Sequence, residues 1–265
     1  MASSRITGID ALRGLDMLLL CGGASVLRLL LEYTGGAPDW LMQQFRHAEW
    51  GGAFTCWDLV MPLFIFITGA SMPFAFAKYR EKGGPHWRLS TTRRVLRRVA
   101  LLFVLGMLVQ GNLASAAPAQ MSLFCNTLQA IAEGYLIAAA VLMFCNLRGQ
   151  IGICLACLIS YWALLRFVPY AGNPGGLFLA DNNLASYIDR LLQGTWHDGT
   201  PYSWILTSLS FGALTLMGSI CGSLILARRG LRTVGLMSLI GLACLLSALL
   251  LEADTPLIKH IYTTT

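Results

Sequence analysis

The residues best suited to acid–base or nucleophilic chemistry lie close together, between positions 45 and 58. His47 stands in the segment F-R-H-A-E-W-G-G (residues 45–52), and Asp58 follows eleven residues later. A histidine can take or give a proton near neutral pH, and a carboxylate on its other ring nitrogen would fix its tautomer. His47 is therefore a candidate general base or nucleophile, and Asp58 and Glu49 are candidates to orient it.

Each of these residues also has a structural interpretation. An interfacial histidine among aromatic residues would show the same pattern as His47. Asp58 precedes the apolar run L-V-M-P-L-F-I-F, where an aspartate suits a helix N-cap and where an acid is destabilising unless it is paired or hydrated. The residue types alone leave the catalytic and structural interpretations open.

A second set of candidates is a cluster of four arginines at one end of an apolar segment. The cluster contains two pairs spaced four residues apart: Arg93, Arg94, Arg97 and Arg98. One interpretation is a topology signal that also binds lipid headgroups. The other is a clamp for phosphate groups, whose oxygens match the arginine fork. The sequence has no metal-ligand spacing, so we expect no metal cofactor.

Membrane helices must position these side chains, because the composition excludes a soluble or disordered chain. Of the 265 residues, 56% are hydrophobic and 12% are charged, and the mean hydropathy is +0.63. A soluble domain could not cover so much apolar surface. Seven apolar segments are each long enough to cross hydrocarbon as a helix: residues 12–31, 57–77, 95–116, 127–147, 149–168, 203–227 and 233–252. The sequence thus predicts an all-α, polytopic transmembrane bundle of about seven spans.

The distribution of charge predicts the orientation of this bundle. The net charge of +6 is a topology signal in a membrane protein, so we expect no nucleic-acid partner. Segment 78–98 carries eight Lys and Arg residues and one acid, which predicts that it and the N-terminus are cytoplasmic. Alternating spans then place His47 on the extracytoplasmic side of the plasma or inner membrane. Amphipathic segments at 38–46 and 183–193 are expected along that outer interface.

Six short motifs, in order along the chain, carry a resemblance to a known family. The motifs are I-D-A-L-R-G (residues 9–14), H-A-E-W-G-G (47–52), D-L-V-M-P-L-F (58–64), N-T-L-Q-A-I-A (126–132), Y-I-D-R (187–190) and P-L-I-K-H-I-Y-T (256–263). They resemble the membrane acetyltransferase family of heparan-α-glucosaminide N-acetyltransferase and its bacterial homologues. The resemblance implies an enzyme that moves an acetyl group from cytoplasmic acetyl-CoA to an amino sugar or glycan on the far side, by N- or O-acetylation.

The resemblance also implies roles for individual residues. His47 would be the active-site histidine, supported by Asp58 and Glu49. With acetyl-CoA as the donor, the phosphate-clamp interpretation of the arginine cluster makes Arg93, Arg94, Arg97 and Arg98 the expected binding site for its phosphates. The residues expected to contact the substrate are Trp50, Gln129, Asp189 and Arg190. One departure from the family pattern is Ala130, which stands where the family has an arginine.

The predicted organisation is one membrane-embedded acyltransferase-like domain over residues 1–265, which we expect to lack the last spans of the family. Membrane lipid is an expected partner, and a homo-oligomer stays open. An alternative function is a transporter or flippase for a sugar-bearing or anionic solute, with Asp16, Arg28 and Glu133 along its path. Transporters of that kind usually contain repeated halves, and this sequence shows none. A third alternative is an inactive membrane scaffold.

Overall fold

The computed structural model describes residues 7–33, 35–52, 54–112, 121–227 and 230–263. Within these ranges every regular element is helical, apart from isolated β-bridges at Tyr170–Asn173 and Phe178–Asn183. The predicted all-α fold is therefore confirmed. The longer helices are α1 (Thr7–Leu18), α2 (Ala24–Tyr33), α4 (Val60–Gly83), α5 (Trp87–Val109), α6 (Thr127–Phe144), α7 (Leu147–Phe167), α8 (Leu184–Gln193), α9 (Ser208–Ala227) and α10 (Leu231–Leu251). The short helices are η1 (Leu19–Gly23), α3 (Asp39–Gln43), η2 (Cys56–Leu59), η3 (Gly84–His86), η5 (Gly194–Trp196) and η6 (Lys259–Ile261).

Five of the described helices are long and apolar enough to cross a membrane: Cys56–Glu81, α6, α7, α9 and α10. A sixth span results if α1 and Cys21–Tyr33, which meet at a bend of 55°, form one broken span. The bend contains Gly22, whose φ of 107° favours glycine. Helix α5 also runs along the bundle, but arginines occupy its first half. The prediction of about seven spans is compatible with this arrangement; residues 113–116 of the predicted third span lie outside the described residues.

The most extensive helix contact joins α4 and α9 and depends on glycine. A Cβ atom on Gly69 of α4 would overlap the carbonyl oxygen of Thr215, and one on Gly218 of α9 would overlap that of Phe66. Small residues allow two backbones to approach this closely in a membrane bundle. Helices α6 and α7 also pack against α9. The central position of α4 matters for function because Asp58 lies in η2, directly before it.

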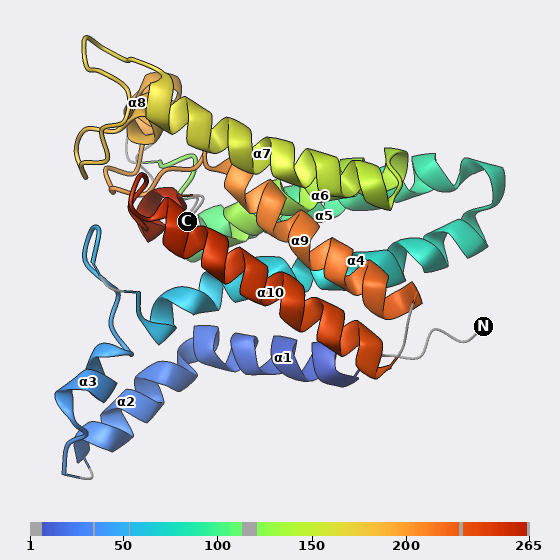
Figure 1. Ribbon diagram of the computed structural model, residues 1–265, viewed down its shortest axis with the longest axis horizontal. Helices are drawn as coiled ribbons and strands as arrows, with labels where there is room; N and C mark the ends of the chain where they lie inside the picture. The colour runs from blue at the N-terminus through green and yellow to red at the C-terminus, as the bar shows by residue number, and fades with distance from the viewer. Residues whose placement is uncertain (1–6, 34, 53, 113–120, 228–229, 264–265) are drawn as a thin grey trace.

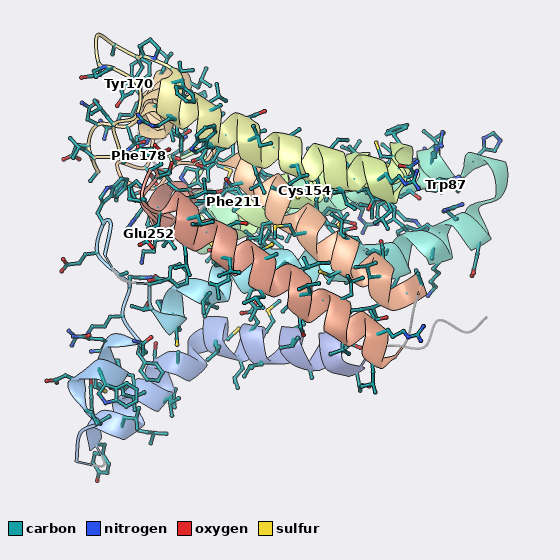
Figure 2. All side chains as sticks on the ribbon, viewed as in Figure 1. Trp87, Cys154, Tyr170, Phe178, Phe211 and Glu252 are labelled. Carbon is teal, nitrogen blue, oxygen red and sulfur yellow. The ribbon has the colours of Figure 1, made fainter. Side chains whose placement is uncertain are left out.

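The two ends of the bundle differ in structure and charge. Figure 2 places Trp87 at one end and Tyr170, Phe178 and Glu252 at the other. The Trp87 end contains the turn between α4 and α5, together with its basic residues. At the opposite end, α8, its flanking loops and the segment after α10 come together (Figure 1). This second end also holds the loop between α3 and α4, which carries His47.

The segment after α10 is firmly packed into this second end. Ile258 and Ile261 join a buried cluster with Tyr161 and Leu165 of α7 and with Leu184 of α8. Residues distant in sequence are thereby fixed next to one another.

Candidate active site

The loop before α4 folds back on itself around Asp58. Thr55 and Asp58 form a capping box at the start of η2, in which each side chain accepts a hydrogen bond from the backbone amide of the other. The backbone amide of Trp57 donates to the carbonyl oxygen of Gln44 at 3.0 Å, and the amide of Cys56 donates to Oε1 of Gln44 at 3.0 Å. These bonds bring the loop that carries His47 back beside the start of α4.

Both ring nitrogens of His47 have partners. Nδ1 lies 2.9 Å from Oδ1 of Asp58, and the indole N–H of Trp57 donates to Nε2 at 3.1 Å. Because an indole nitrogen only donates, Nε2 must accept, and the proton is therefore on Nδ1, which donates to Asp58. The two contacts select one neutral tautomer. The His47 side chain is still 61% exposed, so the ring can meet a ligand.

The carboxylate of Asp58 is fully buried and accepts hydrogen bonds on both oxygens. Oδ1 accepts from His47 and from the ammonium group of Lys259, whose Nζ lies 2.5 Å away. Oδ2 accepts from the amide of Ala48 at 3.0 Å, and from the hydroxyl and amide of Thr55 at 2.8 and 3.4 Å. These donors replace the hydration that a carboxylate loses on burial.

Lys259 is the member of this cluster that the sequence analysis did not single out. It lies in η6, 201 residues from Asp58, and only 10% of its side chain is exposed. One signal could have found it, because Lys259 stands in P-L-I-K-H-I-Y-T (residues 256–263), one of the six motifs that carry the family resemblance. The sequence does not show which carboxylate pairs with its charge.

His260 lies next to this cluster in an aromatic stack. Its ring stacks on Trp50 with centroids 5.1 Å apart, and its centroid lies 4.7 Å from that of Tyr202. Burial, followed by the positive charge of Lys259, lowers the pKa of His260 to about 4. The ring is therefore neutral at physiological pH. Trp50 also donates its indole N–H to the carbonyl oxygen of Phe178 at 2.8 Å, which ties the loop between α7 and α8 to the site.

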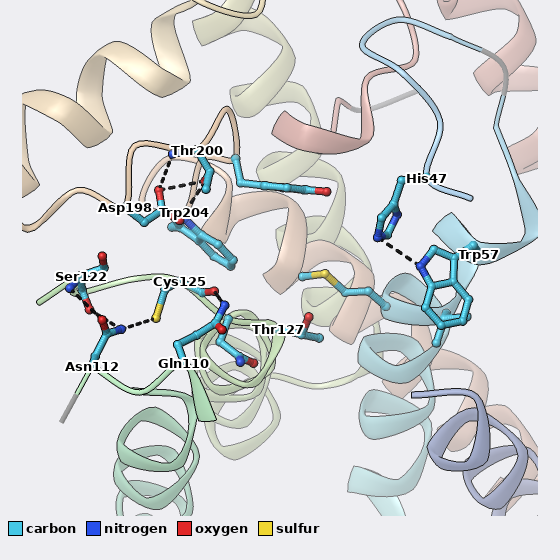
Figure 3. A pocket seen from close by; sticks show the side chains of 14 residues that line it. His47, Trp57, Gln110, Asn112, Ser122, Cys125, Thr127, Asp198, Thr200 and Trp204 are labelled. Atoms are coloured by element: carbon cyan, nitrogen blue, oxygen red, sulfur yellow. Dashed lines mark hydrogen bonds between the residues drawn. The ribbon is translucent and has the colours of Figure 1, made fainter. Parts of the chain in front are cut away.

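A cavity of about 580 Å³ opens beside His47 and Trp57 (Figure 3). Trp204 and Asp198 line it across from His47, and Tyr202 adds a further aromatic ring. Much of the remaining lining consists of amide and hydroxyl side chains, namely Gln110, Asn112, Ser122, Asn126, Thr127 and Thr200. Aromatic faces combined with several amides and hydroxyls suit a polar ligand with ring surfaces. Sequence reasoning missed this lining, because it comes from segments without a shared motif.

Comparison with known proteins bears directly on this site. Residues 5–181 match the protein family described as heparan-alpha-glucosaminide N-acetyltransferase, catalytic. The chain belongs to this family. It is 26% identical over 232 residues to the mouse (Mus musculus) heparan-alpha-glucosaminide N-acetyltransferase, with 74% of this chain and 33% of the relative covered. It is 30% identical over 105 residues to the human (Homo sapiens) protein of the same name, with 40% and 14% covered. The chain thus spans about a third of the length of its mouse relative.

Family membership, together with the apolar helices, makes this chain a multi-pass integral membrane protein. The match to the heparan-alpha-glucosaminide N-acetyltransferase family includes His47, Trp57 and Asp58, and it ends before the segments that contain Asp198 and Lys259. The histidine and its two nearest partners therefore belong to the matched region. The other side of the site comes from the part of the chain beyond it.

Gln129, predicted to contact the substrate, has no exposed surface. Its Oε1 accepts from the amide of Cys125 at 2.8 Å, and its Nε2 donates to the carbonyl oxygen of Leu123 at 2.7 Å. Gln129 thereby orders the loop that leads into α6, and residues of this loop line the cavity. Its direct contact with substrate stays a prediction.

Asp189 and Arg190 of α8 lie on different surfaces. The Asp189 side chain is buried and accepts from the backbone amides of Trp204 at 2.6 Å and Ile205 at 3.0 Å. Burial raises the pKa of Asp189 to about 6, although these two amides oppose the shift. Arg190 is exposed and donates to the carbonyl oxygen of Asp181 at 3.5 Å. Asp189 orders the Trp204 wall of the cavity, and the predicted substrate contacts of both residues stay predictions.

Glu49 is exposed on the His47 loop. Among the described residues, the hydrogen bonds of the His47 ring go to Asp58 and Trp57. The backbone carbonyl of Glu49 accepts a hydrogen bond from the amide of Gly52 at 3.0 Å. The prediction that Glu49 assists His47 is not tested by these contacts.

The arginine cluster lies on α5, and all four side chains are exposed: Arg93, Arg94, Arg97 and Arg98. Arg94 lies over the ring of Tyr79, 4.8 Å from its centroid, and Arg98 lies over Tyr135 at 4.5 Å. Cation–π contacts therefore hold one of the two pairs against α4 and α6. The predicted contact of the cluster with acetyl-CoA stays a prediction.

Proposed function

We propose that this chain transfers an acetyl group from acetyl-CoA to an amino sugar or glycan, with His47 as the base or nucleophile. The observation that carries the proposal is the His47–Asp58 pair at the wall of a polar and aromatic cavity. Membership of the heparan-alpha-glucosaminide N-acetyltransferase family supports the same chemistry. No metal ion is needed for it.

The reactive atom of His47 is Nε2, because Nδ1 donates its proton to Asp58. As a base, Nε2 takes the proton of the attacking amine or hydroxyl while that group bonds to the acetyl carbon. The C–S bond then breaks, and CoA leaves as a thiolate that takes up a proton. As a nucleophile, Nε2 itself bonds to the acetyl carbon and CoA leaves, and the acceptor then displaces the imidazole. Both routes require that Trp57 first release Nε2.

Asp58 supports either route in two ways. Its hydrogen bond to Nδ1 keeps the lone pair on Nε2, and its negative charge stabilises the imidazolium that forms when Nε2 takes a proton. The orientation of the pair is set by the capping turn at Thr55. Asp58 thus acts on the reaction through His47.

The cavity is the proposed site for the acceptor. Trp57, Tyr202 and Trp204 offer aromatic faces to a sugar ring, and amides such as that of Asn112 can bond its hydroxyls. Asp198 supplies a carboxylate that can accept a hydrogen bond from the amino group of an amino sugar. This lining favours a sugar with an amino group over a purely apolar acceptor.

The donor is proposed to bind from the cytoplasmic side, at the basic end of the bundle. We place the turn between α4 and α5 in the cytoplasm of a cell with a plasma or inner membrane, because basic residues concentrate on that side. Arg94 and Arg98, held over tyrosine rings, would bind phosphates of acetyl-CoA. His47, at the opposite end, then faces the extracytoplasmic side. Residues 1–265 form one membrane-embedded domain in contact with lipid.

His47→Ala in the full-length protein tests the proposal. The readout is acetyl transfer from labelled acetyl-CoA to glucosamine in detergent or liposomes, followed by mass spectrometry. We expect a loss of at least about 10²-fold, the lower range for a general acid–base residue. His86→Ala is the matched control, because His86 ends η3 at the basic end of the bundle, and it should leave turnover unchanged.

The two chemical roles of His47 are separable in the same preparation. Without an acceptor, a nucleophilic His47 traps labelled acetyl on the protein, whereas a general base does not. A His47→Ala protein that turned over at the ordinary rate would refute the assignment. Solute transport would then become the leading function.

A further inference from the structure

We infer that Lys259 is a positioning residue of the active site: its ammonium group shares Oδ1 of Asp58 with His47 and thereby sets the orientation and basicity of the imidazole. The inference rests on the proposed function, since it concerns how His47 is prepared for that reaction. Lys259 lies outside residues 5–181, the range that matches the family. Its contact with Asp58 is created by tertiary folding across 201 residues.

The backbone next to Lys259 is held in place by buried partners. The phenol of Tyr161 donates to the carbonyl oxygen of Ile261, and both residues are fully buried. The hydroxyl of Ser210 donates to the carbonyl oxygen of Tyr262 at 2.9 Å. Tyr262 also adopts a left-handed backbone conformation, with φ of 42°, which a non-glycine residue keeps only when its surroundings enforce it. Lys259 is therefore fixed at the site rather than free to leave it.

The electrostatic effect follows from two donors on one carboxylate oxygen. Asp58 is fully buried and only 10% of the Lys259 side chain is exposed, so water and salt screen this pair weakly. The positive charge of the Lys259 ammonium group offsets the negative charge of the Asp58 carboxylate. A protonated imidazole at His47 consequently gains less from Asp58 than it would from an unpaired carboxylate. His47 keeps the hydrogen bond that fixes its tautomer, and the lone pair stays on Nε2, as a base or nucleophile requires.

Other titratable groups near the cluster do not account for the same effect. They are His260, Tyr202, Tyr262, Asp198, Arg46 and Glu49. His260 has a pKa of about 4, and burial raises the pKa of Tyr202 and of Tyr262. These three groups stay neutral between pH 5 and 8. Asp198, which lines the other side of the cavity from His47, accepts a hydrogen bond from the hydroxyl of Thr200. Arg46 and Glu49 are exposed.

The test compares the pH dependence of kcat/KM in the wild-type protein and in Lys259→Met. The methionine keeps most of the length of the side chain and removes its charge. We expect the acidic limb of the profile to move to higher pH by about one unit or more, the effect of a unit charge at this range. Lys259→Arg keeps the charge and should keep the wild-type limb. Lys259→Gln, which keeps a donor but no charge, should show the same shift if Lys259→Met does not fold.

The matched control is Arg166→Gln. It removes a cation from the exposed pair that Arg166 forms with Asp254 at 3.0 Å, at the same end of the bundle, and should leave the limb unchanged.

One result would overturn the inference. It is a Lys259→Met or Lys259→Gln profile that falls by the same factor at every pH, which would make Lys259 a structural ion-pair partner only. Failure of the proposed function looks different, because His47→Ala would then stay active.

Discussion

Asp58→Asn should lower kcat for acetyl transfer by about 10²- to 10⁴-fold while the helices stay folded. The two oxygens of Asp58 serve different partners. Oδ1 accepts from His47 and Lys259, and Oδ2 accepts from Ala48 and Thr55. Asparagine has one oxygen and one nitrogen that only donates, so one of the two sets of donors must lose its acceptor.

Either orientation of the asparagine impairs His47, by changing its tautomer or by releasing its loop. If the amide nitrogen replaces Oδ1, it donates to Nδ1 of His47 and forces the proton onto Nε2. That tautomer has no lone pair at Nε2 and sets its N–H against the indole N–H of Trp57. If the nitrogen replaces Oδ2, it opposes the amides of Ala48 and Thr55, and the loop that carries His47 loses its anchor. A wrong tautomer alone accounts for the upper end of the expected loss.

The assay is single-turnover and steady-state acetyl transfer to glucosamine, with acetyl-CoA binding measured separately. Asp254→Asn is the matched control, because Asp254 is an exposed carboxylate paired with Arg166 at the same end of the bundle. It should keep kcat near the wild-type value. A kcat for Asp58→Asn within threefold of wild type would refute the argument that Asp58 controls the tautomer of His47.

Three further predictions concern the surroundings of the site. Trp57→Phe removes the indole N–H that donates to Nε2 of His47. Diethylpyrocarbonate should then modify His47 about two- to tenfold faster, the equivalent of one hydrogen bond. An unchanged rate would contradict the contact. The pKa of His260 is lowered from 6.5 to about 4 on folding, so its neutral ring contributes stability above pH 6.5 that is lost as pH falls toward 4. His260→Phe should reduce this acid-dependent fall in melting temperature, and an equal fall in both proteins would disprove it. Gly218→Val would overlap the backbone of α4 and should lower the free energy of unfolding by about 1–3 kcal/mol. Thermal shift measures the loss, and Gly235→Val is the control because a Cβ there meets open space.

Hydropathy and local spacing were sufficient to predict the helices. The predicted spans 127–147 and 149–168 correspond to α6 and α7, because about 20 apolar residues in hydrocarbon can satisfy their backbone only as a helix. The amphipathic prediction at 183–193 corresponds to α8 in the same way. The approach of His47 to Asp58 was also within reach of the sequence, since only eleven residues separate them and a capping turn ends at Asp58.

Tertiary structure decided which distant groups share the site. Lys259 reaches Asp58 from 201 residues away, and the cavity joins the polar loop around Asn112 to Asp198 and Trp204. Tertiary structure also directed the Gln129 side chain into the loop that precedes α6. The residue type alone does not reveal that Gln129 orders this loop. Local patterns record only which face of a helix is apolar. The partner of a buried charge depends on how α4, α7 and α9 pack, because only that packing brings η6 against the start of α4.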